Sequence, residues 1–238
     1  MFENFEVRTV LITGASTGLG RALTRTLAAQ GWHPIITARG RVRLHQVRDE
    51  FPAGKVTAVP GDVSDPEHRE RLGEAIRSRG RLDLVVNNAS RLGPSPMPRL
   101  AEFPLDELID IYATNVVAPL GVLQIALPFL QAAGGLAVNI SSDAAVEPYE
   151  GWGGYGSSKA ALDHLTAIFA AENPNVPIYS FDPGDMRTEM HQAAFPGEDI
   201  TDRPEPETVV PALLRLIDLR PPSGRYVGSE LLAAQMSS

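Results

Sequence analysis

A tyrosine and a lysine stand four residues apart in the segment WGGYGSSKAALDHL, at Tyr155 and Lys159. Side chains at this spacing share one face of a helix. A free tyrosine titrates at about pH 10, too high for easy proton transfer at neutral pH, and a neighbouring ammonium lowers that pKa. Such pairs are common by chance. Lys159 is, however, one of two lysines among 21 basic residues, which favours a ligand-binding ammonium over a solubilising charge.

A glycine-rich turn near the N-terminus fits two kinds of enzyme: Gly14-Ala15-Ser16-Thr17-Gly18, within VLITGASTGLGRAL. As G-x-S-x-G it matches the nucleophile elbow of a serine hydrolase, with Ser16 as the nucleophile. That site also needs an oxyanion hole built partly by a loop from an earlier strand. Because Gly14 follows the first predicted strand, no earlier strand exists to supply the loop. The position of the turn therefore disfavours a hydrolase.

A dinucleotide-binding site explains the same turn better. Gly14, Gly18 and Gly20 permit a tight bend, close approach of a pyrophosphate and packing of the following helix. In such folds an acid about 20 residues further on binds the ribose of NAD, whereas an arginine accommodates the 2′-phosphate of NADP. Here the second predicted strand ends on Ala38 and Arg39. The sequence therefore predicts NADP(H) as the cofactor, with NAD(H) as the alternative.

These residues need a scaffold, and the chain alternates short aliphatic or β-branched runs with helical patterns. This order is typical of a parallel sheet covered on both faces. The predicted strands are residues 9–13, 34–38, 55–59, 82–87, 136–141, 177–181 and 225–227. The predicted helices are residues 19–30, 42–50, 66–79, 105–132, 155–172 and 206–216. The sequence thus predicts an α/β fold: one Rossmann-type domain over residues 1–238, with a doubly wound, parallel, seven-stranded sheet and helices on both faces.

Residues 184–207 form the one long segment without clear periodicity. Loops of this length are usually functional or disordered. Ligands of open α/β sheets bind at the carboxyl ends of the strands. Because this segment follows the sixth predicted strand, we expect it to be a substrate lid.

The composition disfavours several classes of protein. A net charge of −8 disfavours a nucleic-acid binder. The chain has no cysteine, which excludes disulfides and thiolate metal sites, and its five histidines are scattered without ligand spacing, so we expect no metal. The N-terminus does not have the pattern of a signal peptide. Since the absence of cysteine suits a reducing compartment, we expect a cytoplasmic protein.

A long stretch without charged residues lies between Asp110 and Asp143. Polar residues and prolines, Asn115 and Pro119 among them, interrupt its apolar surface. We therefore interpret it as a buried helix and not as a membrane span. A soluble helix that is apolar nearly all round must be covered by the sheet, by a partner subunit or by both.

Taken in order, the motifs resemble those of the short-chain dehydrogenase/reductase family over nearly the whole chain. The resemblance implies a catalytic tetrad of Asn115, Ser142, Tyr155 and Lys159. Ser142 lies 13 residues before Tyr155 (155 − 142 = 13), the usual family spacing, and Ser141 is the alternative. The implied cofactor contacts are Gly14, Ser16, Thr17, Gly18, Leu19, Gly20, Arg39, Asp62, Val63, Asn88, Ala89, Tyr155, Lys159, Pro183, Gly184, Met186 and Thr188.

Two residues depart from the family pattern. Ser90 follows the Asn-Asn-Ala motif of residues 87–89, where the family often has glycine, and we expect it to alter packing only. Thr17 stands where many NADP-using members carry a basic residue. This second departure leaves Ser16 and Arg39 to bind the 2′-phosphate.

The resemblance implies a carbonyl reductase or ketoreductase that uses NADPH. In that mechanism Tyr155 donates a proton to the carbonyl oxygen while hydride reaches the carbon, and Ser142 orients the oxygen. The family mechanism also implies that Lys159 lowers the tyrosine pKa and binds the nicotinamide ribose. In the same scheme Asn115 anchors a water that relays protons.

The expected partner is a small carbonyl or alcohol substrate, with no nucleic acid and no membrane. The residues expected near the substrate are Asp143, Glu147, Tyr149 and Trp152. By family resemblance we also expect a homodimer or homotetramer, paired through the helix at 105–132 and the helix that begins at Tyr155. The alternative function is a non-catalytic NADP(H)-binding sensor of the same fold. The complete tetrad argues against it, because a sensor does not need Tyr155.

Overall fold

Seven strands form one sheet in the computed structural model of this protein, which describes residues 7–236. The strands are β1 Thr9–Thr13, β2 His33–Thr37, β3 Thr57–Ala58, β4 Leu84–Asn87, β5 Leu136–Ile140, β6 Ile178–Asp182 and β7 Gly224–Val227. All neighbours pair in parallel, in the order β3-β2-β1-β4-β5-β6-β7. The chain crosses from β3 to the other side of β1, the reversal of a doubly wound fold. The predicted fold class is confirmed; residues 1–6 and 237–238 of the predicted domain lie outside the described residues.

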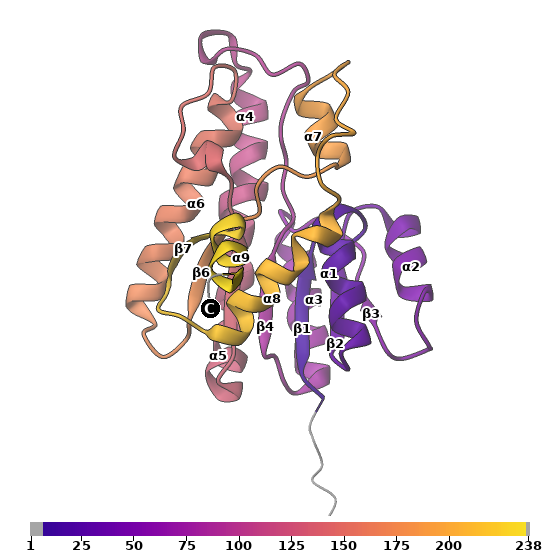
Figure 1. The fold of residues 1–238 in the computed structure, drawn as a ribbon. Coiled ribbons are helices and arrows are strands. Elements are labelled where there is room, and N and C mark those ends of the chain that lie inside the picture. The colour runs from indigo at the N-terminus through magenta and orange to yellow at the C-terminus, as the bar shows by residue number, and fades with distance from the viewer. Residues whose placement is uncertain (1–6, 237–238) are drawn as a thin grey trace, which may run out of the picture.

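Helices cover both faces of the sheet (Figure 1). They are α1 Gly18–Ala29, α2 Arg41–Asp49, α3 Pro66–Arg79, α4 Leu105–Tyr112, α5 Ala118–Ala133, α6 Gly153–Glu172, α7 Glu189–Ala194, α8 Val210–Leu219 and α9 Gly228–Met236. One core lies between the sheet and α1, α2 and α8. A second core lies between the sheet and α3, α5 and α6. Alternate residues of β1 face opposite sides, so Val10 and Ile12 join the first core and Leu11 joins the second.

The bounds of α3 match the predicted helix 66–79, and local chemistry explains why. The Asp65 carboxylate accepts a hydrogen bond from the backbone N–H of Glu67 at 2.9 Å, which caps the first turn. Pro66 fits the first helical position because no N–H is needed there. Gly80 ends the helix with a left-handed φ of 72°.

The predicted helix 105–132 is interrupted in the structure. A π-type turn over Ala113–Val117 separates α4 from α5. Pro119 explains the break, because it has no N–H to donate to the carbonyl of Asn115 four residues earlier. Turns of this kind often occur at functional sites. This one contains Asn115, whose side chain is buried.

Three further differences concern shorter elements. The predicted lid, residues 184–207, contains α7, whose first turn is capped by the Thr188 hydroxyl accepting from the backbone N–H of His191 at 3.1 Å. The strand predicted at 55–59 is reduced to β3, two residues long. The helix α9 follows β7 without a gap, and no helix was expected there. In Figure 1 α7 stands above the upper edge of the sheet, beyond the carboxyl end of β1.

One helical segment among the described residues, Leu105–Ala133, is long and apolar enough to cross a membrane by length and composition alone. Its α5 part packs against the sheet through Val122, Leu123, Ala126 and Leu130. Its α4 part carries Leu105 and Ile109, which are 72% and 66% exposed. The expected cover by the sheet is therefore found for α5, and the surface of α4 stays open.

Candidate active site

A cavity of about 520 Å³ opens at the carboxyl ends of the strands. Its walls come from the segments that follow β1 to β6, from α6 and from α7. Of the predicted cofactor contacts, all but Gly20 line this cavity. Of the predicted tetrad, Ser142, Tyr155 and Lys159 line it and Asn115 does not. The fold thus brings together residues from both ends of the sequence.

Close packing explains why the turn after β1 requires glycine. Gly14 has a φ of +65°, and a Cβ there would lie 2.8 Å from the Cα of Ala89. A Cβ at Gly20 would lie 2.5 Å from the carbonyl oxygen of Gly14. Gly20 therefore supports the turn from beneath and does not face the cavity, which corrects its predicted role as a direct contact.

The Asn-Ala pair after β4 fixes this turn. The Asn88 amide nitrogen donates to the carbonyls of Thr13 and Gly14 at 2.9 and 3.0 Å. The Thr13 hydroxyl accepts from the backbone N–H groups of Asn88 and Ala89 at 3.0 and 2.9 Å. The two strands on either side of the chain reversal are thereby locked together at the point where ligands of this fold class bind.

The N-terminus of α1 has the properties of an anion site. Thr17 precedes the helix and makes no side-chain cap, and the first turn carries no acid. The first backbone N–H groups of a helix have no partner inside the helix and lie at the positive end of its dipole. Ser16, Thr17, Gly18 and Leu19 all line the cavity here. These residues fit a bound pyrophosphate.

Arginines lie at the outer end of this cavity, near the carboxyl end of β2. Arg39 lines it and, among the described residues, makes no hydrogen bond or ion pair. Burial raises the pKa of Asp62, whereas hydrogen bonds from Ser64 and the charge of Arg39 lower it by more. Arg43 also lines the cavity, and its guanidinium bonds Glu189 of α7 at 2.9 Å.

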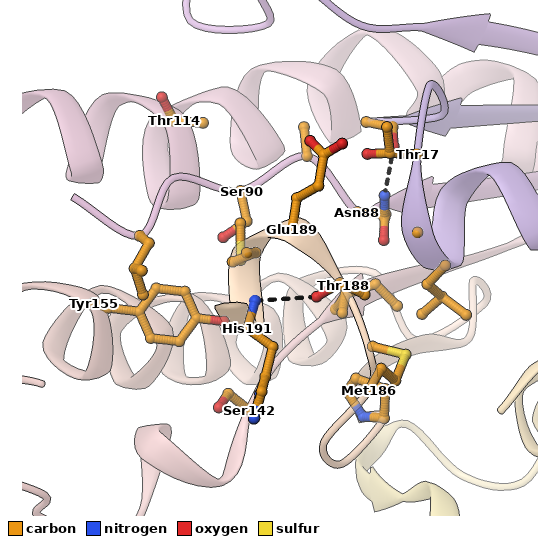
Figure 2. A pocket seen from close by; sticks show the side chains of 18 of the residues that line it. Thr17, Asn88, Ser90, Thr114, Ser142, Tyr155, Met186, Thr188, Glu189 and His191 are labelled. Carbon is orange, nitrogen blue, oxygen red and sulfur yellow. Dashed lines mark hydrogen bonds between the residues drawn. The ribbon is translucent and has the colours of Figure 1, made fainter. Parts of the chain in front are cut away.

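Tyr155 lies in the first turn of α6 and is partly buried in the cavity wall. Burial raises the pKa of its phenol to about 12, against the effect of the neighbouring Ser90 and Ser142 hydroxyls, which lower it. Figure 2 shows these two hydroxyls on either side of the phenol in that view. At neutral pH the phenol therefore carries its proton.

The effect of Lys159 on the pKa of Tyr155 differs from the expected one. Its ammonium donates to the carbonyl of Ile140 at 2.7 Å and lies 5.5 Å from the centre of the Tyr155 ring. Burial lowers the pKa of Lys159 to about 8, and the charge of Asp163 opposes that shift. The expected lowering of the Tyr155 pKa is not found in this structure, because burial of the phenol outweighs the other influences on it.

Ser141 and Ser142 both line the cavity, and the Ser142 hydroxyl lowers the pKa of Tyr155. The Ser142 hydroxyl also donates to the Asp143 carboxylate at 2.9 Å and accepts from the backbone of Ala144 at 3.2 Å. Its carbonyl is held by Arg225 of β7 at 3.1 Å. Ser141 is buried, and its hydroxyl has no hydrogen-bond partner among the described residues.

Asn115 forms hydrogen bonds with protein groups behind the cavity wall. Its amide nitrogen donates to the Arg91 carbonyl and to the Ser158 hydroxyl, both at 2.9 Å. Its amide oxygen accepts from the Arg91 backbone at 2.8 Å and from the Ser90 hydroxyl at 3.2 Å. The side chain thus ties the segment after β4 to α6. A water held by Asn115 stays a prediction.

Comparison with known proteins agrees with this geometry. A model of the family described as short chain dehydrogenase matches residues 8–199. The chain belongs to the short-chain dehydrogenase family. It is 35% identical to sepiapterin reductase of Mus musculus over 199 residues, 77% of this chain and 76% of the relative. It is 32% identical to benzil reductase ((S)-benzoin forming) of Saccharomyces cerevisiae over 216 residues, 87% of this chain and 80% of the relative.

Solved structures of other short-chain dehydrogenases superpose well on this one. A short chain dehydrogenase of Escherichia coli complexed with NADPH has a TM-score of 0.86 at 29% identity, covering 93% of this chain and 96% of the other. An alcohol dehydrogenase of the archaeon Thermococcus sibiricus complexed with 5-hydroxy-NADP has a TM-score of 0.83 at 29% identity, with the same coverage. An NADP-type cofactor is thus found among proteins of this family that share the fold.

The substrate end of this short-chain dehydrogenase differs from the prediction in part. Asp143 and Trp152 line the cavity, whereas Glu147 and Tyr149 lie outside its wall. Tyr149 instead donates to the Asp143 carboxylate at 3.0 Å. Its role is therefore to support Asp143 from outside.

Two residues of the lid segment complete this end of the cavity and were not foreseen. His191 lines the cavity, has a side chain 10% exposed, and has no partner for its buried Nε2 among the described residues. Its ring lies 4.8 Å from that of Phe195, which lies 5.8 Å from Trp152. The only sequence signal was their position in an aperiodic segment. Phe195 does not line the cavity itself; it packs behind His191 and Trp152, and the Trp152 ring lies 5.9 Å from that of Tyr155.

Proposed function

We propose that this short-chain dehydrogenase reduces a ketone or aldehyde to an alcohol, or runs the reverse oxidation, with NADP(H). The observation that carries the proposal is the shared cavity. Tyr155, with the hydroxyls of Ser90 and Ser142 as neighbours of its phenol, opens into the same space as the turn before α1. A dinucleotide on that turn and a carbonyl at Tyr155 therefore share one enclosed volume.

In this proposal the protein supplies orientation and a proton. The carbonyl oxygen accepts hydrogen bonds from Tyr155 and Ser142, and the phenol gives its proton to that oxygen as charge develops there. Lys159, held by Ile140, presents an ammonium that binds the hydroxyls of the nicotinamide ribose. When bound, NADPH supplies the hydride for the carbonyl carbon. The Thr188 hydroxyl and the backbone near Met186 hold the nicotinamide carboxamide, and residues 184–207 act as the lid.

The choice of NADP(H) rests on the arginines. Arg39 lines the cavity without an ion-pair partner among the described residues, and no acid replaces it at the end of β2. A guanidinium binds a phosphate strongly because it can donate two parallel hydrogen bonds. The complexes of related proteins with NADPH and 5-hydroxy-NADP support the same choice.

The proposal is tested by supplying substrates. We expect NADPH consumption, read at 340 nm, with at least one member of a panel of aromatic ketones, 1,2-diketones, aldehydes and sugar carbonyls, and NADP+ reduction with the matching alcohol. Both directions are expected because one phenol serves as acid and as base. Tight NADPH binding without turnover across the whole panel contradicts the proposed activity and favours the sensor function.

We also propose that the protein is a cytoplasmic homodimer or homotetramer. Leu105, Ile109 and Val117 are 72%, 66% and 54% exposed along one helical segment. Exposed apolar side chains that gather on one element mark an interaction surface. On α6, Ile168 is 47% exposed as well. A second copy of the chain, paired through α4 and α6, covers these side chains.

Replacement of Ile109 by glutamate tests the assembly. The wild-type protein is expected to sediment as a dimer or tetramer at micromolar concentration, and Ile109→Glu to shift it toward the monomer, because a carboxylate is costly to bury in an apolar interface. Val42→Glu is the matched control, since Val42 is 71% exposed on α2. A wild-type monomer, or equal effects of both variants, contradicts the proposed interface.

A further inference from the structure

Ser90 occupies a place in the site that its expected role in packing does not explain. Its hydroxyl donates to the amide oxygen of Asn115 at 3.2 Å. The same hydroxyl is a neighbour of the Tyr155 phenol and lowers the pKa of that phenol. It also lines the cavity (Figure 2). The Ser90 hydroxyl therefore lies between the Asn115 amide and the Tyr155 phenol, two residues of the predicted tetrad.

The backbone next to Ser90 is fixed, so its hydroxyl can turn without moving the chain. Asn115 bonds both the N–H and the carbonyl of Arg91, at 2.8 and 2.9 Å. The Arg91 guanidinium is itself held by Glu107 of α4 at 2.7 Å. The Ser90 hydroxyl can then move only by rotation about the Cα–Cβ and Cβ–Oγ bonds.

A serine hydroxyl has one proton to donate and two groups here can accept it. While Tyr155 is protonated, the Asn115 oxygen is the acceptor, as the 3.2 Å bond shows. Once Tyr155 becomes a phenolate, it is the stronger acceptor, because a hydrogen bond to a charged group is about twice as strong as one between neutral groups. Asn115 is not left unsatisfied by the exchange, since the N–H of Arg91 still donates to it at 2.8 Å.

We propose that Ser90 is a positioning residue for proton transfer, whose hydroxyl turns from Asn115 to Tyr155 when the phenol gives up its proton. The step is balanced: the O–H bond of Tyr155 breaks, the O–H bond of the alcohol forms, and Ser90 keeps its own proton. In the oxidation direction the same hydroxyl steadies the phenolate that accepts a proton from the alcohol. This inference rests on the proposed function, and Ser142 supports the phenol from its other contact.

Three substitutions at one position test this role through the pH dependence of alcohol oxidation. The rate of oxidation rises with pH as Tyr155 loses its proton. Removing a donor to the phenolate raises the pKa of the phenol, so Ser90→Ala and Ser90→Gly are expected to move this limb upward by roughly 1 pH unit. The oxidation rates of these two variants are then about tenfold lower than the wild-type rate at pH values below the limb, and they approach the wild-type rate above it. Ser90→Thr keeps a hydroxyl and is expected to keep the wild-type limb. Wild-type rates of Ser90→Ala below the limb, or a loss in Ser90→Thr as large as the loss in Ser90→Ala, overturn the proposal.

A second measurement needs no substrate and separates this inference from the proposed function. Tyrosines labelled with 13C at the phenol carbon are followed by NMR from pH 8 to 12, because burial raises the pKa of Tyr155 to about 12. The signal of Tyr155 is identified by its absence in Tyr155→Phe. The Tyr155 signal in Ser90→Ala is expected to show less phenolate than the wild type at the upper end of this range. Superimposable curves for the two proteins overturn the role of Ser90. Failure of the carbonyl panel instead overturns the proposed activity, whatever the NMR shows.

Discussion

Tyr155→Phe is expected to lower kcat for carbonyl reduction by about 10²- to 10⁴-fold, the range set by loss of a positioned proton donor. Phenylalanine keeps the ring and its contact with Trp152, whose ring centre lies 5.9 Å away. The cavity therefore keeps its shape, and the Kd for NADPH is expected to change by no more than about twofold. Steady-state kinetics and fluorescence titration of the variant with NADPH measure the two effects.

The control for this substitution is Tyr226→Phe. The Tyr226 hydroxyl donates to the carbonyl of Pro222 at 2.7 Å, and the residue does not line the cavity. The substitution Tyr226→Phe also removes a phenolic hydroxyl, and it is expected to leave kcat within about twofold of the wild-type value. If Tyr155→Phe retains wild-type turnover and wild-type NADPH binding, Tyr155 is not the proton donor. If Tyr155→Phe loses NADPH binding together with turnover, the tyrosine holds the cofactor and its catalytic role is unproven.

The order of the fold could be predicted from the sequence because each strand is a short apolar run with its own boundaries. β1 was predicted at its observed bounds, and α3 as well. These elements depend on residues close together in the chain: five consecutive buried residues for β1, and Asp65, Pro66 and Gly80 for α3. The π-type turn over Ala113–Val117 was missed, because Pro119 interrupts the apolar surface without showing that its missing N–H alters the turn before it.

The helix α7 was missed for a related reason. It has six residues, fewer than two turns, and its start depends on one hydrogen bond from the backbone N–H of His191 to the Thr188 hydroxyl. A segment this short has no hydrophobic period to read, and its stability comes from contacts elsewhere. Among these is the ion pair between Glu189 and Arg43, residues 146 positions apart in sequence.

The features of the site likewise fall into those that the sequence predicts and those that depend on the assembled fold. The motif residues could be assigned from the sequence because the chemistry of each motif is local, as with the glycines of the turn after β1. The contacts among motifs could not, since Ser90, Asn115 and Tyr155 meet only when three distant elements pack together. The direction of the Tyr155 pKa shift follows from burial, which is also a property of the assembled fold.

The second large effect is expected on the preference for NADPH over NADH. Arg39→Ala is expected to weaken NADPH binding by about 10- to 100-fold, the worth of a hydrogen bond to a charged group. NADH binding is expected to stay within about twofold, because NADH has no 2′-phosphate for the guanidinium to bind. Isothermal titration calorimetry with NADPH and with NADH measures the two Kd values and their ratio. Arg39 is exposed, so added salt is also expected to reduce the preference of the wild type for NADPH.

Two neighbouring arginines make the test specific. Arg41 is exposed at the start of α2 and does not line the cavity, so Arg41→Ala controls for the loss of one positive charge. Arg43 lines the cavity but is paired with Glu189 at 2.9 Å. A phosphate must compete with that carboxylate, so Arg43→Ala is expected to cost less than Arg39→Ala, and Glu189→Gln to strengthen NADPH binding slightly. Equal affinity of the wild type for NADH and NADPH, unchanged in Arg39→Ala, contradicts this assignment and leaves the α1 turn as a site for the shared pyrophosphate alone.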